Sequence, residues 1–153
     1  MYLTQFSDYA LRVVIYLAAC PDGPASVDRI SRSYGISRNH LAKVVQRMTD
    51  LGIVASTRGR GGGLRLAKPP EQINVGWLVR QTEPHFQIVE CFDPATNTCP
   101  IARACGLKGA LHRAQAAFLG VLDEYHLDQF LTRRPELVAL LGEIPIQSTG
   151  GSQ

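Results

Sequence analysis

Three of the four cysteines in this chain lie in one short stretch, residues 90–106, which carries its most chemically informative pattern. Cys91, Cys99 and Cys105 follow the spacing C-x7-C-x5-C. The stretch is rich in Pro, Asn, Asp and Thr, so we expect a loop. We expect Cys99 at the N-cap of a short helix that begins at Pro100, where the helix dipole favours a thiolate. A loop with three thiolates can hold a metal centre.

Several kinds of thiol site are compatible with three cysteines. A structural zinc site needs four ligands and usually contains a C-x2–4-C pair, which this stretch lacks. A disulfide framework is typical of secreted chains, and residues 1–6 do not resemble a signal peptide. An iron–sulfur cluster accepts wider spacing, because each iron takes its own ligand. The pattern favours a cluster; zinc, a thiol switch and inert loop cysteines are the alternatives, and Cys20 is expected to be a small buried hydrophobic residue.

The charge of this 153-residue chain is unevenly distributed around a net value of +3. Residues 1–80 contain 11 basic and 5 acidic residues, whereas residues 81–153 contain 5 and 8. A basic first half indicates a polyanionic partner. No apolar run approaches the length of a membrane span, so we expect a cytoplasmic protein in a reducing compartment, without a membrane partner.

Residues 26–52 have the outline of a helix-turn-helix motif. A short amphipathic helix ends at Gly35, and a second helix capped by Ser37 ends at Gly52. The outward face of the second helix carries side chains of the types that contact base edges and phosphates. These candidate DNA-binding residues are Ser37, Arg38, Asn39, His40, Lys43 and Arg47.

Residues 53–66 are typical of a wing, with two short strands around a basic glycine-rich tip. Arg58 and Arg60 could enter a narrow minor groove, and Gly61 would let the backbone approach DNA closely. The tip lacks the G-x-x-x-x-G-K-[ST] pattern of a phosphate-binding loop. Together with the helix-turn-helix, it predicts a winged helix-turn-helix fold, mainly α with a small β-wing.

The other segments are expected to position these sites. We expect Ser7 to cap the opening helix, Asn74 to cap another helix, and Trp77 to be a core anchor. A long helix after Gly106, running to about Leu131, has an apolar seam suited to dimerisation, with packing on its own N-terminal domain as the alternative. The expected organisation is a DNA-binding domain (1–80), a cluster-binding loop (81–106), a dimerisation helix with a C-terminal helix (107–142) and a disordered tail (143–153).

Three segments together resemble the bacterial winged-helix iron–sulfur regulators. They are residues 6–12, residues 58–67, and the cysteine pattern with its neighbours Pro100-Ile101 and Gly106-Leu107. The resemblance covers about residues 1–140. It implies a homodimeric repressor that binds a double-stranded DNA operator under the control of its cluster.

Within this family, residues 99–119 resemble the branch that senses nitric oxide. That branch implies a [4Fe–4S] cluster held by Cys91, Cys99, Cys105 and Asp8, with Asp8 donated by the partner subunit. Reaction with nitric oxide would release DNA and derepress nitrosative-stress genes. Glu90, Asp93, His85 and His112 are the other candidates for the fourth ligand.

The alternative is a regulator of cluster supply with a [2Fe–2S] cluster. That branch has a histidine three residues after the last cysteine, and Lys108 stands at this position. We do not expect an enzyme, because the sequence has no Ser/His/Asp arrangement and no substrate-binding signature.

Overall fold

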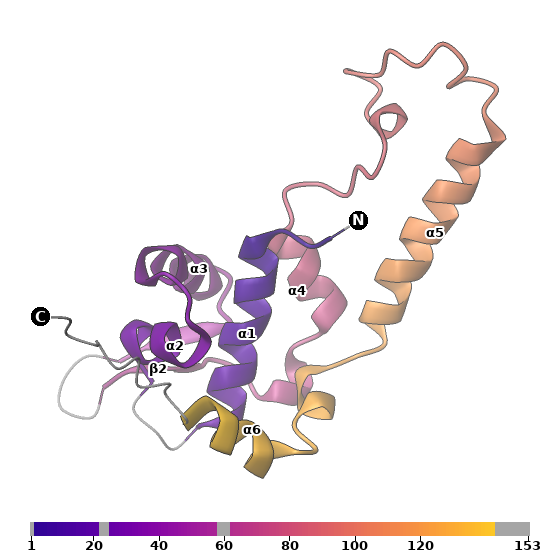
Figure 1. The fold of residues 1–153 in the computed structure, drawn as a ribbon. Coiled ribbons are helices and arrows are strands. Elements are labelled where there is room, and N and C mark those ends of the chain that lie inside the picture. Colours follow the sequence, from indigo (N-terminus) through magenta and orange to yellow (C-terminus); the bar gives the residue numbers. More distant parts are fainter. Residues whose placement is uncertain (1, 22–24, 58–61, 143–153) are drawn as a thin grey trace, which may run out of the picture.

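The computed structural model describes residues 2–21, 25–57 and 62–142 and shows a mainly helical chain with one small sheet. This confirms the expected fold class. Figure 1 shows α1 in the middle of the molecule, with α2 and α3 on one side and α4 on the other. The α-helices are α1 (Gln5–Ala19), α2 (Val27–Tyr34), α3 (Arg38–Asp50), α4 (Val75–Thr82), α5 (Gly106–Asp123) and α6 (Arg134–Gly142). The strands are β1 (Val54–Ser56) and β2 (Leu64–Leu66), and three 3-10 helices are η1 (Pro70–Gln72), η2 (Glu90–Phe92) and η3 (Leu127–Phe130).

The hydrophobic core lies around α1. Buried side chains from α1, α2, α3, α4 and η3 pack together there, and each large one contributes roughly 1.5–3 kcal/mol of burial free energy. The largest of these that are fully buried are Ile30, Leu41, Met48, Ile53, Ile73, Leu78 and Leu127. The core therefore fixes the helix-turn-helix elements to the opening helix.

Local signals begin and end the two helices of the helix-turn-helix. The Ser26 side chain caps α2 by accepting a hydrogen bond from the Arg29 N–H at 3.1 Å. Gly35 and Gly52 both have positive φ, 65° and 67°, where a side chain would be strained. Ser37 is the N-cap residue of α3, although its side chain makes no capping hydrogen bond.

The opening helix begins earlier than expected. Thr4, not Ser7, caps α1, and its hydroxyl accepts a hydrogen bond from the Ser7 N–H at 3.3 Å. Ser7 is fully buried, and its hydroxyl donates to Thr82 Oγ1 at 2.8 Å. The prediction for Ser7 was wrong because this hydroxyl pairs with a residue 75 positions away.

Trp77 is not a core anchor. Its side chain is 38% exposed, whereas Leu78 and Val79 of the same helix are buried. The helix itself is capped as expected, because Asn74 Oδ1 accepts a hydrogen bond from the Trp77 N–H at 2.8 Å. The α4 face that meets the core is therefore rotated away from Trp77.

The long helix is shorter than expected and ends at Asp123 instead of about Leu131. Beyond it, the backbone pairs with the start of α4: the Val75 N–H donates to the Tyr125 carbonyl, and the Leu127 N–H donates to the Ile73 carbonyl, both at 3.0 Å. This pairing satisfies the backbone groups that the helix no longer uses. It also buries Leu127, which is 1% exposed.

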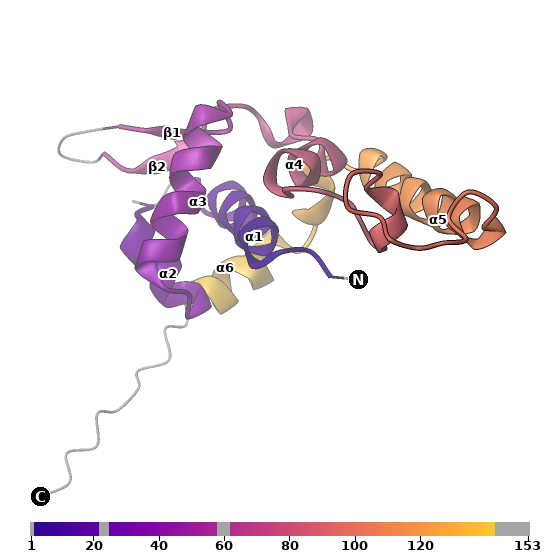
Figure 2. The same ribbon diagram turned by 90° about the horizontal axis from the view of Figure 1, so that it is seen from above.

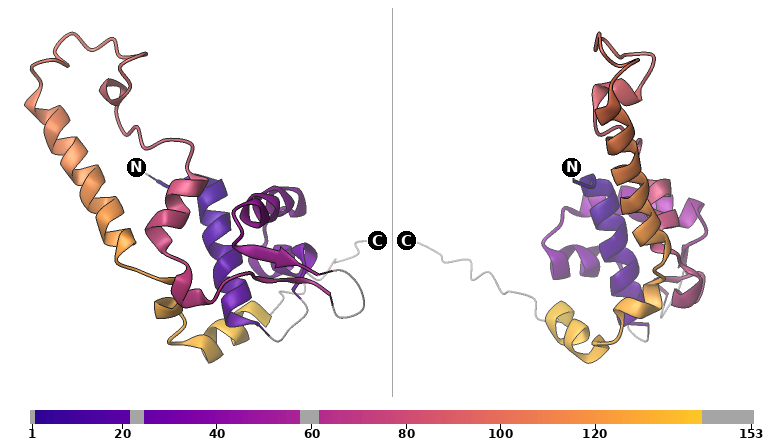
Figure 3. Two further views of the ribbon diagram at one scale, coloured as in Figure 1. Left: turned by 180° about the vertical axis from the view of Figure 1, so that it is seen from behind. Right: turned by 90° about the vertical axis from the view of Figure 1, so that its right-hand side faces the viewer.

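Helix α5 stands away from the core. Its 18 residues span about 27 Å, and none of them is buried. Figure 3 shows α5 beside α4, with the segment between them crossing at one end. Seen from above in Figure 2, α5 and the β-strands lie at opposite ends of the molecule. None of the helices in the described ranges is both long and apolar enough to cross a bilayer.

Candidate metal centre and nucleic-acid interface

The three clustered cysteines lie on one loop that runs from η2 to the start of α5, and each is half-buried and outside any disulfide. Cys91 belongs to η2, and the Cys99 N–H donates to Asn97 Oδ1 at 3.1 Å. The short helix expected at Pro100 is a series of turns instead. The cysteine that stands at the start of a helix is instead Cys105, the N-cap residue of α5.

Two carboxylates hold the loop in shape. Glu90 Oε1 accepts hydrogen bonds from the Thr98 N–H and from the Thr98 hydroxyl, the latter at 2.7 Å. Asp93 accepts from the Ala95 N–H at 2.9 Å. These bonds lower the pKa of both carboxyl groups, chiefly through the backbone donors. Glu90 and Asp93 thus accept hydrogen bonds from groups of the loop itself.

Two contacts attach the loop to α5. The rings of Phe92 and His112 stack with centroids 3.7 Å apart and planes inclined by 3°. The Gln115 side-chain amide donates to the Phe86 carbonyl. The stack places η2, and with it Cys91, against the helix that begins after Cys105.

The three thiols are suitable ligands for an iron–sulfur cluster, although in this conformation they do not lie close enough together to bind one. Thiolates are the ligands that iron–sulfur clusters take, and three of them come from one loop. The described residues contain no group of three Cys, His, Asp or Glu side chains close enough to hold a metal ion. Asp8, 43% exposed, instead pairs with Arg12 at 2.8 Å.

The candidate DNA-binding side chains of α3 form one exposed face. All six residues, Ser37, Arg38, Asn39, His40, Lys43 and Arg47, are exposed, while Leu41, Val44 and Met48 of the same helix are buried. Arg38 Nε donates to Asp28 Oδ1 of α2 at 2.5 Å. Arg47 Nη2 donates to the Gln81 carbonyl of α4 at 3.3 Å, so Arg47 also links α3 to α4.

The wing is confirmed as an antiparallel pair in which Val54 faces Leu66. Hydrogen bonds between Thr57 and Gly63 close the base of its tip, the backbone one at 3.0 Å. The Leu64 N–H also donates to the Ala25 carbonyl at 2.8 Å, which ties the wing to the start of the helix-turn-helix. Arg58, Arg60 and Gly61 lie outside the described residues.

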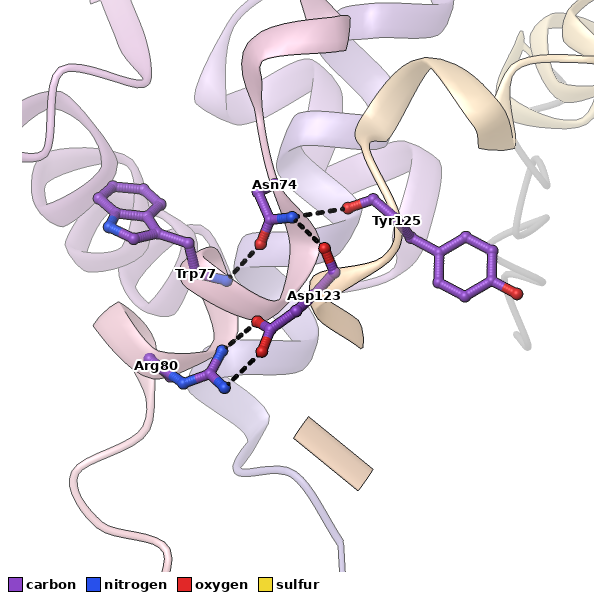
Figure 4. A network of polar contacts seen from close by, with 5 residues as sticks. All are labelled: Asn74, Trp77, Arg80, Asp123 and Tyr125. Carbon is purple, nitrogen blue, oxygen red and sulfur yellow. Dashed lines mark hydrogen bonds and ion pairs between the residues drawn. The ribbon is translucent and has the colours of Figure 1, made fainter. Parts of the chain in front are cut away.

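Sequence reasoning missed a polar junction between α4 and the end of α5 (Figure 4). Two nitrogens of Arg80 contact the two carboxylate oxygens of Asp123, one pair at 2.8 Å. Asn74 Nδ2 donates to the Asp123 and Tyr125 carbonyls at 2.7 and 3.3 Å. The hydrogen bond from Arg80 lowers the pKa of the Asp123 carboxyl group. Only the cap at Asn74 could have indicated this junction, because the charges are 43 positions apart.

Comparisons with known proteins identify the family of this chain and proteins of similar fold. The Rrf2 family model, described as an iron-dependent transcriptional regulator, matches residues 3–133. The HTH-type transcriptional regulators NsrR of Halalkalibacterium halodurans and Bacillus subtilis are each 49% identical over 142 residues, which cover 92% of this chain and 97% of each relative. The structure of CymR, the global cysteine regulator of B. subtilis, has a TM-score of 0.68 at 25% identity and covers 87% of this chain and 98% of that one.

The matched range includes α1 to α5, the wing and all three loop cysteines. The relatives are named as transcriptional regulators, as expected for a chain that is not an enzyme. The chain therefore belongs to the Rrf2 family and is a DNA-binding transcriptional regulator.

Proposed function

We propose that this protein is a cytoplasmic repressor that binds operator DNA as a homodimer and senses nitric oxide through a [4Fe–4S] cluster. Reaction of nitric oxide with the cluster releases the DNA and derepresses nitrosative-stress genes. The observation that carries the proposal is the loop with three half-buried cysteines, attached to α5 in a chain with a helix-turn-helix. The identity to NsrR regulators supports the choice of signal.

Cys91, Cys99 and Cys105 would hold three irons of the cluster, and Asp8 of the partner subunit would hold the fourth. The cluster would supply an iron that reacts with nitric oxide. An oxygen ligand is a weak partner for this soft centre, which makes the fourth iron the natural point of entry. Asp8 is accessible for the role, since its side chain is 43% exposed near the start of α1.

A dimer is supported by the exposure of α5. Leu107 and Val121 are 65% and 52% exposed, and α5 buries no residue within its own chain. A second copy packed on this helix would cover the apolar seam. Helix-turn-helix proteins commonly read two half-sites with two recognition helices, and α3 would supply one from each subunit.

In the proposed complex, α3 lies in the major groove and the wing reaches the adjacent minor groove. Arg38 and Asn39 stand at the start of α3, where recognition helices commonly contact base edges. Lys43 and Arg47 would contact phosphates. Arg58, Arg60 and Gly61 at the wing tip would contact the minor groove.

The four cysteines of the chain allow a matched test. After anaerobic reconstitution, Cys91→Ser, Cys99→Ser and Cys105→Ser should each lose most of the visible [4Fe–4S] absorption and bound iron. Cys20→Ser should keep both, because Cys20 lies at the end of α1, outside the loop. Equal iron content in all four variants, or tight zinc binding without a cluster, would contradict the proposal. A stable [2Fe–2S] spectrum would favour the regulator of cluster supply.

A further inference from the structure

The junction between α4 and α5 connects the two parts of the proposed repressor. Asn74 performs two tasks there: its Oδ1 caps α4, and its Nδ2 donates to the carbonyl of the last residue of α5 and to the Tyr125 carbonyl just beyond it. Arg80 forms a two-pronged ion pair with Asp123, the last residue of α5. A pair with two parallel contacts fixes the relative orientation of the guanidinium and carboxylate groups as well as the distance between them.

Backbone contact makes the junction tight. A β-carbon built at Gly76 would lie 2.7 Å from the Asp123 nitrogen, closer than real side chains come to backbone atoms. The two helices therefore touch at this glycine, next to the ion pair. Sliding or rotation of α5 against α4 would have to break the polar contacts of Asn74 and Arg80.

Helix α4 is also bonded to the DNA-binding elements. Arg47 of α3 donates to the Gln81 carbonyl at 3.3 Å. Ser7 of α1 donates to Thr82 at 2.8 Å, and the Thr4 N–H donates to Glu83 at 2.7 Å. Helix α4 and its flanking residues thus contact both the end of α5 and the helices of the DNA-binding part.

The Arg80–Asp123 pair is poorly suited to a role in folding stability alone. Its side chains are 37% and 44% exposed, and exposed ion pairs contribute little to stability because solvent screens them. The pair matters more for the orientation of α5 than for stability. A rotation of about 10° at this end of α5 would displace the far end of the helix by about 5 Å over its length.

We propose that Arg80 and Asp123 are positioning residues that fix the angle of α5 and so set the half-site separation that the dimer accepts. This inference rests on the proposed function, because two recognition helices must be held apart by paired copies of α5. The distance between them then depends on the angle at each junction. Loosening the junction lets several separations bind with similar affinity.

The test measures the preference for half-site separation. A half-site is first selected from random duplexes with the wild-type protein. Duplexes with two inverted copies are then made at separations that step by one base pair. We expect the wild-type protein to prefer one separation by at least about tenfold in Kd, and Arg80→Lys and Asp123→Asn to reduce that preference to within about threefold. Arg80→Asp combined with Asp123→Arg should restore much of it.

A matched control is present at the start of α6, where Arg133, just before the helix, forms another exposed two-pronged ion pair with Glu136, with contacts of 3.1 and 2.7 Å. Arg133→Lys should keep the wild-type preference, which separates the junction from a general effect of losing an ion pair. Wild-type preference in Arg80→Lys and Asp123→Asn would overturn the inference while leaving the repressor proposal intact. Failure of the wild-type protein to bind any selected duplex would overturn both.

Discussion

Asp8 has two alternative partners in this account. It pairs with Arg12 one turn along α1, at 2.8 Å, and in the proposed dimer it binds the cluster of the other subunit. Ligation requires the carboxylate to leave an exposed ion pair, which costs about 0–1 kcal/mol. Such a small cost is compatible with a ligand that can be exchanged easily.

Replacing Asp8 by Ala should retain the cluster on its three cysteines but change its rate of reaction with nitric oxide. The reason is that the fourth iron loses its protein ligand while the thiolates remain. Stopped-flow absorption of the reconstituted variant measures the rate, with Asp128→Ala, an exposed carboxylate in η3, as the control. A spectrum and a rate equal to those of the wild-type protein would remove Asp8 from the site.

His112 has a stacking role that separates it from the other candidate ligands. Its ring lies on Phe92, 3.7 Å between centroids, beside the turn that carries Cys91. His112→Phe preserves an aromatic pair, whereas His112→Ala removes it. We expect His112→Ala to lose the cluster to a chelator several times faster than the wild-type protein, and His112→Phe to resemble the wild-type protein. Equally fast loss from both variants would indicate that His112 is a ligand instead.

Helix α4 packs so closely against the end of α5 that its Gly76 has no room for a side chain. Gly76→Ala would place a β-carbon 2.7 Å from the Asp123 nitrogen, so the helices must move apart. Overpacking of this kind typically costs about 1–3 kcal/mol of the free energy of unfolding. Chemical denaturation of the cluster-free protein measures the loss.

Gly109→Ala is the matched control for Gly76→Ala. Gly109 also lies inside a helix, but a β-carbon there would meet nothing within 4 Å. Alanine is favoured over glycine in helices by about 1 kcal/mol, so Gly109→Ala should not destabilise the protein. Similar losses in both variants would mean that the contact with Asp123 is not the cause.

The elements also show which parts of the fold the sequence could predict. Ser26, Gly35, Gly52 and Asn74 act on backbone groups a few residues away, so local patterns were sufficient to predict the helix-turn-helix outline and the start of α4. The wing strands followed from their flanking residues in the same way. Patterns of this kind identify elements better than their ends.

Contacts between distant residues were beyond such patterns. The helix from Gly106 stops at Asp123 because the following residues pair with the start of α4, and no local signal marks that end. Ser7 does not cap α1, because its hydroxyl donates to Thr82, a residue far away in the sequence. The cysteine spacing identified the loop, but it could not predict the stack of Phe92 on His112 that attaches the loop to α5.

The whole molecule has the cysteine loop towards one end and the helix-turn-helix with its wing towards the other, with α4 between them. The cysteine loop and α5 extend to one side, and the wing extends to the other (Figure 2). The basic excess, 11 basic against 5 acidic residues, belongs to residues 1–80, the part of the sequence that contains the helix-turn-helix and the wing. In the proposed dimer, a change at the cluster affects α3 by altering the packing of the subunits or of their helices. The α4–α5 junction and the dimer contacts are therefore the structures that would carry the signal.

The most direct test of the account follows the cluster and DNA binding in one sample. The protein is purified and reconstituted without oxygen, mixed with a duplex that it selected from random DNA, and titrated with nitric oxide while visible absorption and fluorescence anisotropy are recorded. We expect a [4Fe–4S] spectrum that collapses together with the release of DNA. A cluster that ignores nitric oxide, or DNA that stays bound after the spectrum has collapsed, would contradict it.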